Sequence, residues 1–205
     1  MKHDPRTDAG LHLSLSEISA LSARATRGAG RNWGEAEEAS EAACWLARAG
    51  LDWASALLEV LEASNDEADC ALRAGMLLAD SAACPKTIAV QKGMMSCPCF
   101  LLPFVARMAE LTRQRTLIEW GDTRVVLAPG EAPRFDSPVR IAGRAEVTIK
   151  PVSNDNTPCP NWLQTHRSSV TASQHARLMK LMMACTVPSS ASSLTGAGAL
   201  GGDND

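Results

Sequence analysis

The 205-residue sequence contains no tyrosine, so no phenol is available to act as a general acid. It also lacks any apolar run long enough to cross a bilayer, because its most apolar stretches, 100–106 and 178–185, fall far short of the roughly 20 residues that a membrane helix needs. No apolar segment of the signal-peptide kind follows Lys2. We therefore expect a soluble, cytoplasmic protein that does not bind membranes.

The sequence also lacks an excess of positive charge. Lysine and arginine number 20 against 23 aspartates and glutamates, which gives a formal net charge of -3. A surface that binds nucleic acid usually carries a basic excess, so we expect no nucleic-acid partner. The seven cysteines are odd in number and show no spacing typical of a secreted disulfide framework, which agrees with a cytoplasmic location.

The first third of the sequence has the patterns of helices joined by short loops. A capping box over 14–17, in which a serine precedes a glutamate by three residues, predicts a helix that runs to about Arg27. The same logic over 32–35 starts a second helix with one face of small residues, and Asp52 is a plausible N-cap for a third. We expect these three helices and a short fourth one over 68–80.

The remainder is richer in β-branched residues. Two such runs, 116–120 and 123–127, flank Gly121 and Asp122, a pattern that predicts a β-hairpin. A last helix is expected over 172–184, capped by Thr171 or Ser173. Further strands are expected over 87–90, 139–142 and 145–152.

Helices followed by strands and one more helix indicate an α+β fold. We expect an N-terminal helical unit of about three helices packed on a small, mostly antiparallel sheet, with a C-terminal helix and a Gly-rich tail. The expected single domain spans 13–187, and the ends, 1–12 and 188–205, are expected to be flexible.

The glycine-rich link between the first two helices is the first candidate site. Gly28 and Gly30 lie between Arg27 and Arg31, immediately before a helix. Free N–H groups and the dipole at a helix start would favour a carboxylate or phosphate there, with the two arginines assisting. No strand precedes the link, so it is neither a Walker loop nor a dinucleotide fingerprint. The alternative is a structural corner between two helices, with a glycine C-cap at Gly28.

Two other groups of residues invite a chemical interpretation. Glu37, Glu38 and Glu41 could serve as a general acid or bind a metal, but carboxylates in the first turns of a helix are also what the helix dipole favours on a solvated face. The four cysteines Cys84, Cys97, Cys99 and Cys159 could suggest zinc, yet a C-x-C spacing without a second pair is not a usual zinc site. We expect no metal and no cofactor.

Several segments carry a resemblance to a known family. They are Leu15–Ile18, Ala25–Gly30, Trp33–Gly34, Ala36–Ala39, and the closing Gly196–Gly198 with Asp203–Asp205. The chain resembles an uncharacterised, mainly alphaproteobacterial domain-of-unknown-function family, from about residue 13 to the last residue. The resemblance implies no established activity. The chain departs from the family pattern after residue 185, where Thr186, Ala191 and Leu194 stand in place of a tyrosine, a glutamate and an arginine.

Three functions fit these observations. The first is an accessory or small-ligand-binding protein of a metabolic pathway, which binds an anion or carboxylate through the 27–38 region. The second is an enzyme acting on a small carboxylated metabolite, with Arg27 and Arg31 holding the substrate and Glu37 or Glu38 as acid or base. The third is a non-catalytic subunit of a larger enzyme. The expected partners are a small anionic metabolite, another protein or a second copy of the chain.

Overall fold

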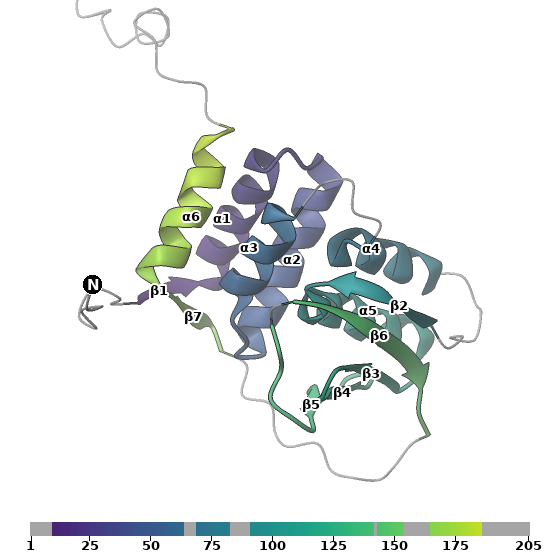
Figure 1. The fold of residues 1–205 in the computed structure, drawn as a ribbon. Coiled ribbons are helices and arrows are strands. Elements are labelled where there is room, and N and C mark those ends of the chain that lie inside the picture. The colour runs from purple at the N-terminus through teal and green to yellow at the C-terminus, as the bar shows by residue number, and fades with distance from the viewer. Residues whose placement is uncertain (1–9, 64–68, 83–90, 142, 154–164, 186–205) are drawn as a thin grey trace, which may run out of the picture.

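The structure is a computed structural model that describes residues 10–63, 69–82, 91–141, 143–153 and 165–185. A group of helices forms one side of the molecule, and a twisted sheet with two further helices forms the other (Figure 1). The expected α+β fold is confirmed. The helices, with one short 3₁₀ segment η1, are α1 (Leu15–Gly28), α2 (Trp33–Arg48), α3 (Trp53–Glu62), α4 (Ala71–Ala82), η1 (Pro98–Leu101), α5 (Leu102–Thr112) and α6 (Ala172–Met183).

Strands form two antiparallel sheets. The larger has five strands in the order β2-β6-β3-β4-β5, and the smaller is a two-stranded ribbon of β1 and β7. The expected small, mostly antiparallel sheet is therefore confirmed. The strands are β1 (Leu11–Ser14), β2 (Gln91–Ser96), β3 (Thr116–Trp120), β4 (Thr123–Leu127), β5 (Arg134–Phe135), β6 (Arg144–Pro151) and β7 (Arg167–Val170).

Side-chain caps start the helices where the sequence predicts them. At α1 the Ser14 hydroxyl accepts a hydrogen bond from the Glu17 N–H, and Glu17 accepts one from the Ser14 N–H in return. Asn32 and Glu35 form the same reciprocal pair at α2, at 2.8 and 3.0 Å. These bonds satisfy N–H groups that the helix itself leaves without acceptors. Asp52 caps α3 and Thr171 caps α6, as expected.

The predicted hairpin of β3 and β4 is confirmed, and Gly121 adopts a φ of +50° in its turn. The strand expected at 145–152 is β6, but the strand expected at 139–142 is wrong for its described residues, 139–141. The Arg140 N–H donates to the Thr123 hydroxyl, and the Arg140 carbonyl accepts from the Trp120 indole. These side-chain bonds take the groups that a strand ladder would use. The strand expected at 87–90 and the Gly-rich tail lie outside the described residues.

Several elements of the fold have no counterpart in the sequence-based prediction: strands β1, β2, β5 and β7, the short η1 and helix α5. Strand β1 begins at Leu11, inside the segment expected to be a flexible lead-in, and pairs with β7 from the other end of the chain. Helix α6 then packs along α1, and the two lie side by side in Figure 1. Helix α5 was also not predicted; it packs against β3 and β4 and contributes Phe104 and Met108 to the single hydrophobic core that joins helices and sheet.

Candidate functional site

The link between α1 and α2 uses its own N–H groups. The Ala29, Gly30 and Arg31 amides donate to carbonyls of the last turn of α1, at 2.9, 3.0 and 3.2 Å. The Asn32 amide donates to the Glu35 carboxylate. The expectation of free N–H groups in this link is therefore wrong: the link forms the structural corner that was its alternative.

Arg31 is buried in the protein instead of facing a ligand. Its side chain is 0% exposed, and it donates to the Val60 carbonyl at 3.1 Å. Its guanidinium lies 3.5 Å from the Glu35 carboxylate, which Arg73 also contacts at 2.8 Å. A guanidinium is stable in an apolar interior only when a carboxylate and hydrogen bonds compensate for lost hydration. Arg31 thus connects α2 with α3 and serves the fold.

The other charged residues of the predicted site do not converge on one point. Arg27 stacks over the Trp33 ring, 4.5 Å from its centroid, and donates to the Arg31 carbonyl. Glu37 is exposed, whereas Glu38 is half-buried and points to a different part of the molecule. Ligand binding by Arg27, Gly28, Gly30, Arg31 and Glu37 stays a prediction.

The two glycines of the link have different structural roles. Gly30 adopts a φ of +83°, so it is the left-handed residue of the corner, and the expected left-handed C-cap at Gly28 is wrong. Gly28 is the last residue of α1, and a Cβ atom there would collide with the carbonyl oxygen of Leu181 on α6. Its lack of a side chain therefore permits α1 and α6 to approach closely.

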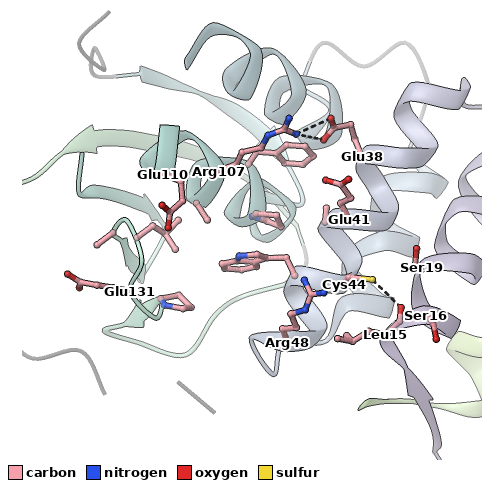
Figure 2. A pocket seen from close by; sticks show the side chains of 18 residues that line it. Leu15, Ser16, Ser19, Glu38, Glu41, Cys44, Arg48, Arg107, Glu110 and Glu131 are labelled. Atoms are coloured by element: carbon pink, nitrogen blue, oxygen red, sulfur yellow. Dashed lines mark hydrogen bonds and ion pairs between the residues drawn. The ribbon is translucent and has the colours of Figure 1, made fainter. Parts of the chain in front are cut away.

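A cavity of about 680 Å³ lies between α1, α2, α5 and the segment that follows β4. We call it the α2 pocket, because Glu38, Glu41, Trp45 and Arg48 of that helix line one side of it. Spacings of three and four residues put these four side chains on one face of α2 (Figure 2). Its volume lies within the roughly 300–1,000 Å³ typical of small-molecule sites.

The walls of the α2 pocket combine apolar and charged side chains. Trp45, Pro103, Phe104 and Leu127 provide apolar surface. Six ionisable groups besides the thiol of Cys44 also line it, and the glutamates outnumber the arginines. They are Glu38, Glu41, Arg48, Arg107, Glu110 and Glu131.

Most of these charges have partners. Arg107 donates to both Glu38 oxygens, at 3.1 and 3.2 Å, and so joins α5 to α2 across the pocket (Figure 2). Glu131 pairs with Arg115 at 2.6 Å. Glu110 accepts from the Gly130 amide and lies 3.8 Å from Arg113.

Two charged side chains of the α2 pocket, Glu41 and Arg48, differ from the others in their pairing. Within the described ranges, no hydrogen bond or ion pair engages the carboxylate of Glu41 or the guanidinium of Arg48. Both influence the Cys44 thiol electrostatically, so both charges act on the same part of the pocket wall. A ligand in the pocket could pair with either.

Cys44 is not an activated nucleophile. Its thiol donates to the Leu15 carbonyl at 3.3 Å. Burial raises the pKa of the Cys44 thiol; nearby Arg48 opposes this and Glu41 adds to it, with a net increase. Because the thiolate is the reactive form, Cys44 is a structural thiol in the wall of the pocket.

Cys97 and Cys99 are buried in the core, and the Cys97 thiol donates to the carbonyls of Ala56 and Ile141. Cys84 and Cys159 lie outside the described residues. In the ranges that the structure does describe, no cluster of three or more histidine, cysteine or acidic side chains could hold a metal ion. Nor does any helix there combine the length and apolarity needed to cross a bilayer.

Comparison with known proteins finds one similarity, which covers the N-terminal helices. Residues 13–87 match the model of a family described as "Protein of unknown function (DUF3726)". The expected resemblance to a domain-of-unknown-function family is confirmed over these residues. The match to DUF3726 includes α1 to α4 and ends before α5, so one wall of the α2 pocket lies outside it, as does the C-terminal motif. No curated protein and no solved structure matches the chain.

Of the six predicted site residues, only Glu38 lines the α2 pocket. The sequence did contain a signal for the other residues of α2 that line the pocket. Helix α2 buries a face of small residues that includes Ala36, Ala39 and Ala43. A tryptophan and an arginine, Trp45 and Arg48, lie away from that alanine face with the two glutamates. The face opposite the buried alanines of an amphipathic helix is ordinarily solvated, but here it lines the α2 pocket.

Proposed function

We propose that this protein binds a small carboxylated molecule in the α2 pocket, as an accessory or ligand-binding protein of a metabolic pathway. The observation that carries the proposal is Arg48. Its guanidinium lines a cavity of about 680 Å³, and no carboxylate of the described residues pairs with it. Guanidinium groups recognise carboxylates through two parallel hydrogen bonds, which makes an arginine in a cavity a natural carboxylate-binding group.

The apolar wall supports a ligand with an organic body as well as an anionic group. Trp45 and Phe104 line the pocket together with Pro103. Burial of a ligand's hydrocarbon against such surfaces contributes roughly 25 cal/mol per Å² of apolar area. Inorganic anions would leave this surface uncovered, so we expect organic carboxylates to bind more tightly than phosphate or sulfate.

An enzyme acting on a carboxylate is the alternative, and the Arg107–Glu38 pair is the observation in its favour. An acid or base must reach the substrate, however, and both oxygens of Glu38 already accept from Arg107. The Cys44 thiol is likewise engaged, by the Leu15 carbonyl. Binding without turnover therefore fits the pocket better. A subunit role and a cytoplasmic location stay predictions.

The test is calorimetric titration with straight-chain carboxylates of three to eight carbons, using the matching primary amides as uncharged controls. We expect carboxylates to bind, and their amides to bind at least about tenfold more weakly because they cannot form the charge-assisted pair. Arg48→Gln should abolish the carboxylate preference. Arg24→Gln is the matched control, since Arg24 is an exposed arginine of α1 outside the α2 pocket.

Three results would contradict the proposal: no carboxylate binds, the amides bind as well as the acids, or Arg48→Gln binds like the unaltered protein. Proton NMR of each probe after overnight incubation separates binding from turnover. A chemically changed probe would favour the enzyme alternative.

A further inference from the structure

The charges of the α2 pocket constrain what else its ligand must carry. Four glutamates and two arginines line the pocket, which leaves two more negative than positive formal charges. Glu38 is matched by Arg107 and Glu131 by Arg115. Glu110 has the Gly130 amide. One carboxylate and one guanidinium, Glu41 and Arg48, then remain without a partner among the described side chains.

These two groups belong to one helix and lie on one face of it. They are seven residues apart, which corresponds to about 10 Å along the helix axis. Trp45 lies four residues after Glu41 and three before Arg48, so its ring belongs to the same face. Figure 2 shows the charged ends of Glu41 and Arg48 directed into the space where the lining side chains gather. An anionic and a cationic position thus flank an aromatic surface.

A ligand that filled the pocket would displace water from both charges. A simple carboxylate would pair with Arg48 but leave Glu41 desolvated and unpaired, which is unfavourable. A dicarboxylate would in addition place like charge beside Glu41 and Glu38. A molecule with one carboxylate and one ammonium would compensate both groups at once.

We propose that the ligand is an amino carboxylate whose two charged groups are separated by an apolar spacer. This inference rests on the proposed function. Arg48 binds the carboxylate, the spacer lies over Trp45, and Glu41 binds the ammonium. Glu41 is thereby the residue that determines specificity for a cationic end.

The experiment compares each carboxylate of three to eight carbons with its ω-amino derivative by calorimetric titration. At the spacer length that binds best, we expect the amino derivative to bind about tenfold more tightly, because it gains one charge-assisted hydrogen bond to Glu41. Glu41→Gln should remove this preference and tighten the binding of the simple carboxylate, because no desolvated negative charge then lies beside it.

Glu37→Gln is the matched control. Glu37 is an exposed glutamate of the same helix that does not line the pocket, so its loss alters net charge equally and should keep the preference. Failure of the inference and failure of the proposed function have different signatures. Carboxylates that bind through Arg48 with no gain from the amino group, or a gain that persists in Glu41→Gln, overturn the inference alone. The absence of binding by both series overturns both.

Discussion

The guanidinium of Arg31 lies 3.5 Å from the carboxylate of Glu35, one helical turn further along the chain, and both side chains are almost fully buried. This pair occupies the position at which the sequence predicts an anion site. Glu35 is the anion that Arg31 binds. The same carboxylate also accepts from the Asn32 amide, so one residue caps α2 and neutralises a buried charge.

Replacement of Glu35 by glutamine should therefore destabilise the protein strongly. Glutamine can still accept from Asn32, but the Arg31 guanidinium would be left buried without a counter-charge, a change that costs about 3–5 kcal/mol. Arg73→Gln should cost about 1 kcal/mol or less, because the Arg73 side chain is 45% exposed. Urea unfolding measures both. Equal losses in the two variants would contradict a buried Arg31–Glu35 pair.

Stability should also fall in acid through Glu35. Burial by itself raises the pKa of the Glu35 carboxyl, but the hydrogen bonds from Arg73 and Asn32, with the charges of Arg73 and Arg31, outweigh it and leave the pKa below its ordinary value. The unfolded chain binds this proton at about pH 4.3, so the contribution is present above that pH and disappears as the pH falls through the lower, folded value.

Urea midpoints measured from pH 6 to pH 3 test this effect. We expect Glu35→Gln to have a lower urea midpoint than the unaltered protein at pH 6. Its midpoint should then fall by less between pH 6 and pH 3. Parallel curves for the two proteins would show that Glu35 carries no such linkage.

Features encoded within a few residues were predictable from the sequence. The reciprocal pairs Ser14–Glu17 and Asn32–Glu35 are capping boxes whose partners are three residues apart, and Gly121 stands in a two-residue hairpin turn. In each case the residues that decide the conformation also make the bonds. Tertiary contacts therefore did not have to be known.

Features that depend on distant contacts were not predictable. Pairing of Leu11 with Val170 joins residues that are nearly the whole chain apart, and neither strand has a local signal. The first residues of α5, 102–105, are all buried and so show no helical alternation, and Pro98 in the preceding η1 and Pro103 in the first turn of α5 are residue types typical of turns. Because α5 supplies a wall of the α2 pocket, the candidate site was missed with it.

The glycine link shows that a correct local pattern does not determine whether its polar groups are free to bind a ligand. Two glycines between two arginines do mark a sharp turn between helices. Whether its amides are free depends on the last carbonyls of α1, and whether Arg31 is free depends on Glu35 and on Val60 of α3. The sequence of the link does not show that the Arg31 guanidinium contacts Val60 of α3.

Gly28 provides a test of the packing between the two ends of the chain. Gly28→Ala would place a methyl group against the Leu181 carbonyl, so α6 must move away from α1, and we expect a loss of about 2–3 kcal/mol. Gly34→Ala is the control: its new Cβ would have its nearest neighbour, Asn32 Oδ1, at 3.4 Å, and alanine is the better helix former. Thermal unfolding should rank Gly34→Ala at or slightly above the unaltered protein. A Gly28→Ala variant of undiminished stability would contradict the close approach of α1 and α6.

The cysteines should differ sharply in their reactivity. Burial raises the pKa of the Cys99 thiol to about 12, with nearby Asp52 and Glu59 adding to it, and burial also raises the pKa of Cys97 and Cys44. Alkylation requires the thiolate and access to it, so these three should resist iodoacetamide in the native protein at pH 8. Cys185 is exposed and should react.

Peptide mass spectrometry after a short exposure to iodoacetamide assigns the modification residue by residue, and a sample in urea, where every thiol is accessible, sets the maximum. Rapid native labelling of Cys44 would contradict its structural role. It would also revive nucleophilic catalysis in the α2 pocket, because a Cys44 thiol that reacts quickly must have left the Leu15 carbonyl and lost its proton beside Arg48. Protection of Cys44 together with labelling of Cys185 is the result expected of a pocket that binds its ligand without covalent chemistry.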